Sequence, residues 1–193
     1  EQAVNDIVIS KSFDNGMICA SESAAIIDAE IYDEVLKEFG RFHVYFCNDE
    51  EKAKLEKYMF GVNAYGEDVN NAHLNPEVVG RPAALTAKNA GFEVPEDTQI
   101  LIVKCNEVGP NEPMTREKLS PVLAVLKANS TDEGISLAEQ FVEFHGLGHS
   151  AAIHTMNQDV VLEFGHRVKA CRIIENAPST LGGIGGVYNS FIP

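Results

Sequence analysis

The sequence predicts an α/β fold with a mainly parallel, twisted sheet flanked by helices. Apolar runs of strand length, such as QILIV at 99–103 and PVLAVL at 121–126, are bordered by polar residues. Other segments place apolar residues three and four positions apart, which is the period of one helix face. Strands that alternate with helices favour parallel pairing, and continuous apolar runs are typical of strands buried on both faces.

Helices and strands are expected to alternate through most of the chain. The predicted helices cover residues 4–12, 32–39, 48–60, 82–90, 131–145 and 160–168. The predicted strands cover residues 23–28, 43–46, 99–103, 121–126, 150–155 and 171–175. A chain of 193 residues is long enough for one domain with a sizeable core, and it contains no internal repeat or Pro/Ser-rich linker.

The first predicted helix has a clear apolar face and a clear end. Val4, Ile7 and Val8 have the spacing of one helix face. Asn15-Gly16 follows, and this pair readily takes the left-handed conformation that stops a helix. An apolar run of strand length begins soon afterwards. The segment between them is therefore expected to be a short joint held by a rigid element on each side.

Capping residues define several of the later helices. Asn48 with Glu51, and Ser130 with Glu133, have the spacing of capping boxes, in which each side chain satisfies a free backbone N–H at the other residue. Pro82 suits the start of a helix because its missing N–H costs nothing in the first turn.

Two segments have the composition of loops. Residues 61–80 are rich in Asn and contain several Gly, which predicts a long surface loop without a catalytic role. Residues 178–186 are rich in glycine but lack the spacing of a phosphate-binding loop and a following helix signal. They are predicted to form a flexible crossing out of the domain, which could also line a substrate pocket.

Charge and composition exclude several classes of function. The formal net charge of −14 argues against nucleic-acid binding, which needs a basic surface. No apolar run has the length of a membrane span, and the polar, acidic first residues do not resemble a signal peptide. The four cysteines are scattered without a Cys-x-x-Cys pair, which favours reduced thiols in a cytoplasmic protein.

One of these cysteines, Cys19, lies in the joint that follows the first helix. A thiol in such a joint can be reached by a substrate while its position stays fixed, as a nucleophile requires. The competing interpretation is a buried structural cysteine, and it is preferred for Cys47, Cys105 and Cys171, which lie in or beside strand patterns. A nucleophilic role needs the thiolate, of which a free cysteine has only a few per cent at neutral pH.

The residues around this thiol resemble a known family. Phe13-Asp-Asn-Gly-Met-Ile-Cys19 is similar to the nucleophile motif of the aldehyde dehydrogenase superfamily. The longer string from Lys11 to Glu22 resembles its CoA-acylating branch, and most closely the aldehyde dehydrogenase half of bifunctional aldehyde–alcohol dehydrogenases. Further matching motifs follow in order at residues 90–95, 116–121, 146–149 and 178–185.

The resemblance implies an aldehyde-dehydrogenase-like catalytic domain over residues 1–193. Acyl-CoA and NADH would be interconverted with aldehyde, CoA and NAD through a thioester on Cys19, physiologically towards the aldehyde. The backbone N–H of Cys19 would stabilise the oxyanion. The nucleotide-binding domain would lie outside this chain, which agrees with the lack of a Gly-x-Gly-x-x-Gly motif. The full-length enzyme would be a homo-oligomer.

The resemblance also assigns roles to three further residues. His149 follows a Gly-Leu-Gly segment between a helix and a strand and would handle a catalytic or CoA proton. The alternative for a histidine here is a role in capping the end of the 131–145 helix, and that role suits His145 better. Glu117 would bind the nicotinamide ribose, although a solvated loop acid is equally compatible with the local sequence. Leu119 would pack near the nicotinamide ring. Histidines elsewhere lack the pattern of a metal site.

Two alternatives remain at this point. A hydrolytic aldehyde dehydrogenase domain would release a carboxylate in place of acyl-CoA, although such enzymes usually have Gln where Met17 stands. In the other alternative, the isolated chain is a non-catalytic assembly module. We expect the isolated chain to have no measurable dehydrogenase activity and a weak affinity for NAD.

Overall fold

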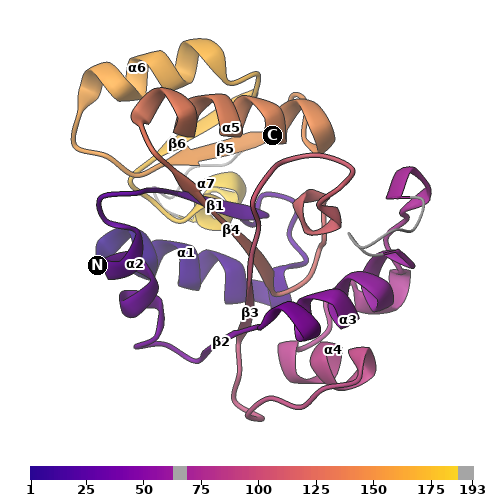
Figure 1. Ribbon diagram of the computed structural model, residues 1–193. Helices are drawn as coiled ribbons and strands as arrows, with labels where there is room; N and C mark the ends of the chain where they lie inside the picture. The colour runs from indigo at the N-terminus through magenta and orange to yellow at the C-terminus, as the bar shows by residue number, and fades with distance from the viewer. Residues whose placement is uncertain (63–68, 187–193) are drawn as a thin grey trace.

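The computed structural model describes residues 1–62 and 69–186, which form two parallel sheets with helices packed around them (Figure 1). The first sheet consists of β1 (Ala24–Asp28), β2 (Val44–Phe46), β3 (Ile100–Lys104) and β4 (Val122–Ala128), in the order β1-β4-β3-β2. The second sheet pairs β5 (Ser150–Ile153) with β6 (Arg172–Glu175). Every strand pair is parallel. The predicted fold class is confirmed, but the strands are divided between two sheets.

Helices cover both faces of the first sheet. On one face lie α1 (Gln2–Ser12) and α2 (Tyr32–Phe39), and on the other lie α3 (Asp49–Phe60) and α4 (Ala83–Ala90). Along β3, Ile100 and Ile102 pack against the first pair of helices, whereas Leu101 and Val103 pack against the second. Successive strand residues point to opposite faces, so a strand that is covered twice must be apolar throughout.

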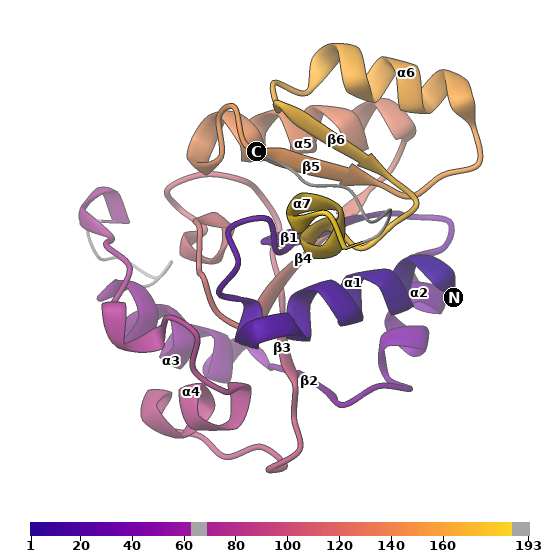
Figure 2. The same cartoon turned by 180° about the vertical axis from the view of Figure 1, so that it is seen from behind.

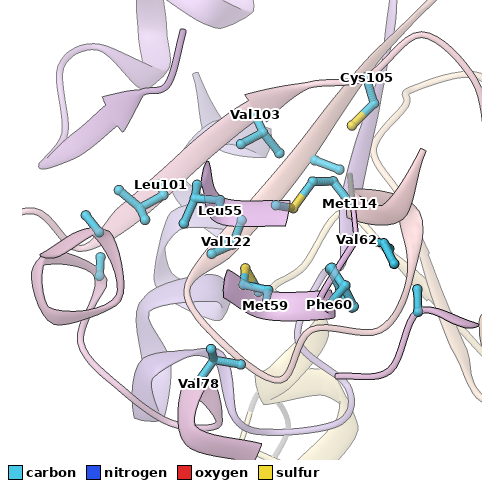
Figure 3. Packing of buried hydrophobic residues seen from close by; sticks show 14 of the residues in the cluster. Leu55, Met59, Phe60, Val62, Val78, Leu101, Val103, Cys105, Met114 and Val122 are labelled. Atoms are coloured by element: carbon cyan, nitrogen blue, oxygen red, sulfur yellow. The ribbon is translucent and has the colours of Figure 1, made fainter. Parts of the chain in front are cut away.

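The larger core cluster lies between the first sheet and the helices α3 and α4 (Figure 3). Leu55 and Met59 of α3 are fully buried against Leu101 of β3 and Val122 of β4. Met114, from the segment before β4, closes one end of the cluster. The apolar face of α3 and the strand runs thus fix this half of the molecule by burial of hydrophobic surface.

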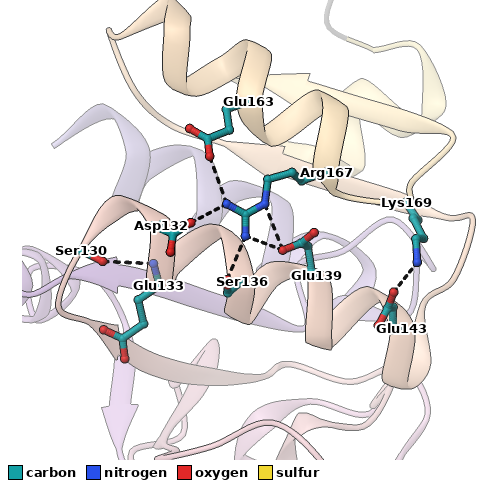
Figure 4. Close-up of polar contacts among 9 residues, drawn as sticks. All are labelled: Ser130, Asp132, Glu133, Ser136, Glu139, Glu143, Glu163, Arg167 and Lys169. Carbon is teal, nitrogen blue, oxygen red and sulfur yellow. Dashed lines mark hydrogen bonds and ion pairs between the residues drawn. The ribbon is translucent and has the colours of Figure 1, made fainter.

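The second sheet has its own small core beneath α5 (Thr131–His145) and α6 (Gln158–Arg167). Arg167 joins the two helices on the outside (Figure 4). Its guanidinium donates to Asp132 at 2.6 Å, to Glu139 at 2.6 Å and to Glu163 at 3.0 Å. These carboxylates raise the pKa of Arg167, so the guanidinium stays charged.

The predicted helix caps are confirmed at one site and half confirmed at another. Asn48 and Glu51 form a reciprocal capping box at the start of α3. Ser130 accepts from the Glu133 backbone N–H as predicted, but the Glu133 carboxylate accepts from the backbone and side chain of Asn129. Helix α5 therefore has the predicted start, with the return bond shifted by one residue.

The prediction of a glycine-rich flexible crossing at residues 178–186 is wrong. Helix α7 (Ser179–Ile184) occupies this segment and ends at Gly185, which has a left-handed backbone with φ of 87°. It packs beside α1 and against the second sheet (Figure 2). The glycines are compatible with a helix here because they permit close packing against neighbouring residues.

The predicted surface loop at residues 61–80 lies partly outside the described residues, which omit 63–68. The described part contains short 3-10 turns at Val69–Asn71 and Pro76–Val78. Val78 is fully buried in the larger core cluster, so this part of the segment is anchored to the domain. Within the described residues, no helix combines the length and the apolar character that crossing a bilayer demands.

The larger cluster should be sensitive to loss of side-chain volume. We expect Leu101→Ala to lower the free energy of unfolding by about 2–5 kcal/mol, because it removes buried methyl groups and leaves a cavity. Leu85→Ala in α4 is the matched control, since Leu85 is 40% exposed and its change should have little effect. Urea unfolding of the chain followed by circular dichroism measures both, and equal effects would contradict the assigned core.

Candidate active site

A left-handed turn places Cys19 at the surface. Asp14 and Asn15 both have φ of 49°, and Gly16 has φ of 67°. A Cβ at Gly16 would lie 2.5 Å from the Ser120 carbonyl oxygen, so only glycine fits there. The next turn is closed by the Ser21 N–H, which donates to the Ile18 carbonyl at 2.8 Å. Cys19 lies inside that turn and is exposed, as a nucleophile must be.

The backbone of Gly80 connects this turn to the segment before β4 through two hydrogen bonds. The Asn15 side-chain amide donates to the Gly80 carbonyl at 3.1 Å, and the Gly80 N–H donates to the Leu119 carbonyl at 3.0 Å. Leu119 itself has φ of 44°, a conformation that costs energy for a residue with a side chain. The end of the 61–80 segment therefore supports the site, which sequence reasoning did not expect.

All the predicted site residues precede the amino ends of parallel strands. Cys19 precedes β1, Glu117 and Leu119 precede β4, and His149 immediately precedes β5. Because β1 pairs in parallel with β4, the first two segments meet at the same edge of the sheet. All four residues line one cavity of about 900 Å³. The lining of this cavity thus includes each of the four residues that the sequence predicts for the site.

The buried Lys118 joins the two segments at this edge. Its ammonium donates to the Ser23 hydroxyl at 2.9 Å, to the Met114 carbonyl at 2.6 Å and to the Arg116 carbonyl at 3.1 Å. Burial lowers the pKa of Lys118 to about 7. Three acceptors around one nitrogen suit the ammonium form, and they hold the segment that contains Glu117 and Leu119 against the chain leaving Cys19.

This geometry allows covalent chemistry on a carbonyl compound. The Cys19 thiol opens into the cavity, and no described residue accepts a hydrogen bond from its backbone N–H. That N–H is free to donate to an oxyanion formed on a carbon bonded to the sulfur. The exposed Glu117 carboxylate and the half-buried Leu119 and His149 side chains supply polar, apolar and proton-transfer groups around the same space.

Comparisons with known proteins identify relatives of this chain. No protein-family model matches the sequence. The whole chain is 60% identical to part of an aldehyde-alcohol dehydrogenase from Streptococcus pneumoniae. The crystal structure of an acetylating aldehyde dehydrogenase from Geobacillus thermoglucosidasius matches 97% of the chain, with 38% identity and a TM-score of 0.88. Over its whole length the chain is therefore similar to part of aldehyde-alcohol dehydrogenases and acetylating aldehyde dehydrogenases.

The match covers only part of each relative. The chain spans 22% of the length of the pneumococcal protein and 40% of the Geobacillus structure. A more distant propionaldehyde dehydrogenase from Rhodopseudomonas palustris, solved with bound CoA and an acylated cysteine, shares the fold. It is 22% identical with a TM-score of 0.80, and the match covers 96% of this chain and 40% of that one.

The remaining three cysteines differ from one another in burial. Burial raises the pKa of both Cys47 and Cys105 to about 12, in agreement with a structural role. The interpretation of Cys171 as a buried structural thiol is wrong, because this residue is exposed and its Sγ lies 3.1 Å from the His149 carbonyl oxygen.

His145 is the basic residue in the last turn of α5, as the helix-capping interpretation expects, but its ring also contacts another segment. Its Nε2 lies 3.1 Å from Nη1 of Arg116, whose guanidinium stacks 5.0 Å from the centre of the Phe144 ring. Burial and the nearby Arg116 charge lower the pKa of His145, which favours the neutral ring as an acceptor. Sequence reasoning missed this pair, although Arg116 stands beside Glu117 in the motif that it singled out.

Among residues 1–62 and 69–186, no group of three or more His, Cys, Asp or Glu side chains could hold a metal ion.

The four thiols should react at very different rates. At pH 8 we expect iodoacetamide to label Cys19 and Cys171, because both are exposed. Cys47 and Cys105 should stay unlabelled, since a thiol of pKa about 12 is ionised only about once in 10⁴ molecules at that pH. Mass spectrometry of the digested chain measures this, and labelling in urea is the control in which all four should react. Equal labelling of Cys105 and Cys19 under native conditions would contradict the assignment.

Proposed function

We propose that the chain is the nucleophile-bearing domain of a CoA-acylating, NAD-dependent aldehyde dehydrogenase. In this function a short acyl-CoA and NADH are interconverted with an aldehyde, CoA and NAD. The observation that supports it best is the position of Cys19, an exposed thiol in a rigid left-handed turn at the edge of a large cavity. Acetyl-CoA and acetaldehyde are the proposed substrates, in keeping with the relatives named above.

The chemistry centres on the Cys19 sulfur. In the reductive direction its thiolate adds to the thioester carbonyl of the acyl-CoA, and the CoA thiolate leaves, so that the acyl group becomes bonded to Cys19. Transfer of a hydride to this carbonyl carbon gives a tetrahedral oxyanion beside the Cys19 N–H. Collapse of that oxyanion breaks the C–S bond, releases the aldehyde and regenerates the thiolate. The reverse sequence oxidises an aldehyde.

Glu117 and Leu119 are proposed to hold the nicotinamide part of the dinucleotide. When bound, NADH supplies the hydride. The residues present fit such a group, because an exposed carboxylate can accept hydrogen bonds from both ribose hydroxyls and the neighbouring leucine offers an apolar contact. Lys118 between them is fully buried and fixed by three acceptors, so both side chains are held at one edge of the cavity.

His149 is proposed to handle the proton of the CoA thiol. It lines the same cavity as Cys19, and its backbone carbonyl accepts from the backbone N–H groups of Cys171 and Arg172. This pairing fixes the start of β5, and so fixes the place from which the imidazole reaches the cavity. A neutral imidazole can take the proton from CoA when the thiolate is needed and return it when CoA leaves.

The remainder of the proposed enzyme lies in other parts of the protein. A nucleotide-binding domain would complete the dinucleotide site and contribute a side-chain amide for the oxyanion. The full-length protein is proposed to be a homo-oligomer that uses small-molecule substrates.

Replacement of the nucleophile tests the proposal directly. In the full-length enzyme we expect Cys19→Ala to abolish acyl transfer and dehydrogenase activity while NADH binding is kept, because the dinucleotide contacts do not involve the sulfur. Reduction of acetyl-CoA followed at 340 nm measures the first, and fluorescence titration with NADH measures the second. Cys171→Ala is the matched control, since it removes another exposed thiol. Turnover by Cys19→Ala at the wild-type rate would refute the proposal.

The nature of the product separates acylating from hydrolytic chemistry. When the full-length enzyme is given acetaldehyde and NAD, we expect the product to be acetyl-CoA, and we expect its formation to require added CoA. Release of acetate at the same rate without CoA would identify a hydrolytic enzyme.

The role of His149 makes a separate prediction. We expect His149→Gln to slow the CoA-dependent step about 10²- to 10⁴-fold, the usual contribution of a positioned proton-transfer group. Acylation of Cys19 by a reactive thioester, which has a better leaving group than CoA, should be affected much less. Pre-steady-state measurement of both steps distinguishes them, and equal losses in the two steps would contradict the assignment of His149 to the CoA proton.

A further inference from the structure

Helix α7 packs directly against the turn that contains the nucleophile. Its Gly183 faces Ala20, the buried residue after Cys19. A Cβ at Gly183 would lie 2.6 Å from the Cβ of Ala20, a distance that real Cβ atoms essentially never show. The Ala20 methyl group has no rotamer by which it could move away. The absence of a side chain at Gly183 therefore sets how closely α7 approaches the chain beside the sulfur.

The start of α7 is bonded to the same part of the molecule. The Ser179 N–H donates to Oε1 of Glu22 at 3.0 Å, and Glu22 stands three residues after Cys19. The Thr180 N–H donates to Oγ of Ser10 in α1 at 2.8 Å, and the Thr180 hydroxyl donates to the Ser10 carbonyl at 3.2 Å. The first N–H groups of the helix thus have partners on both sides of the nucleophile turn.

The Glu22 carboxylate is held in one place by its surroundings. Burial raises the pKa of Glu22, whereas the hydrogen bond from the Ser179 backbone N–H and the charge of Lys11 favour the ionised form. Lys11 is itself fully buried and lines the cavity. A carboxylate with these partners cannot change rotamer without leaving a buried charge unpaired, so its bond to α7 is a fixed link.

We propose that α7 positions the nucleophile, with Gly183 and Glu22 as the two positioning residues. Gly183 of α7 packs against Ala20, and Glu22, three residues after Cys19, accepts a hydrogen bond from the Ser179 N–H of α7. A shift of α7 must therefore move residues 20–22, and with them the sulfur, relative to Glu117 and His149. The inference rests on the proposed function, in which the Cys19 sulfur attacks the carbonyl.

Addition of one methyl group at Gly183 tests the packing. In the full-length enzyme we expect Gly183→Ala to lower kcat for acetyl-CoA reduction by about 10²-fold, the effect of a displacement of roughly 1 Å at a reacting atom. The KM for NADH should stay near the wild-type value, because the segment that contains Glu117 is held by other contacts. The rate of acylation of Cys19 should fall in parallel with kcat.

Two matched variants make the result specific. Gly165→Ala adds the same methyl group to α6, where nothing lies within 4 Å, and should leave kcat unchanged. The double variant Ala20→Gly/Gly183→Ala restores the space between the two Cβ positions and should recover most of the lost kcat. Wild-type acylation by Gly183→Ala, or a double variant no better than Gly183→Ala alone, would overturn the proposal.

Substitution of Glu22 provides a second test if Gly183→Ala does not fold. Glu22→Gln keeps an oxygen that accepts from Ser179, whereas Glu22→Ala does not. We expect Glu22→Gln to retain a larger share of kcat than Glu22→Ala, and equal activity of both with the wild type would overturn the proposal. The Cys19→Ala enzyme tests the chemistry separately. If that variant is inactive while Gly183→Ala behaves like Gly165→Ala, only the positioning role of α7 fails.

Discussion

The close contact between Gly16 and the Ser120 carbonyl is the constraint on which the site depends. It exists because three consecutive residues, Asp14 to Gly16, take left-handed backbone conformations at the end of α1. Two of them have side chains, so the turn stores conformational energy that the surrounding contacts must offset. The Asn15 amide bond to Gly80 is one of those contacts. The result is a chain that leaves α1, touches the segment before β4 and then exposes Cys19.

The candidate residues lie at an unusual edge of the sheet for an open α/β fold. Open α/β sheets usually bind ligands beyond the carboxyl ends of their strands. Here the candidate residues precede the amino ends of β1, β4 and β5. The segments before β1 and β4 are joined by the buried ammonium of Lys118, whose burial is costly unless each of its protons has an acceptor. The sheet itself is an apolar frame, and the polar bonds at its amino edge determine the relative positions of Cys19 and Glu117.

Local signals in the sequence were sufficient for most elements and for the nucleophile turn. The spacing of Val4, Ile7 and Val8, the Asn48 cap and the alternation of apolar runs depend on neighbours in the chain, and these predictions were confirmed. The division of the strands into two sheets was not predicted. The separate pairing of β5 with β6 depends on contacts between segments that are distant in the chain, and local sequence patterns do not report such contacts. The contact of Arg116 with His145 was missed for the same reason, since 29 residues separate them.

Helix α7 shows why glycine content alone is a poor guide to structure. Glycine lowers helix stability because it loses more backbone freedom on folding than other residues, so the sequence TLGGIGG at 180–186 by itself predicts a flexible loop. Tertiary contacts outweigh that intrinsic preference here. A Cβ at Gly183 would collide with Ala20 at 2.6 Å, so this position needs glycine for the helix to reach its place, and a Cβ at Gly182 would lie tightly against the Ile174 side chain at 3.0 Å. The glycines that weaken α7 as an isolated helix are thus the residues that allow it to pack against the nucleophile turn. Only the distances in the folded chain show whether a glycine makes a segment flexible or permits close packing.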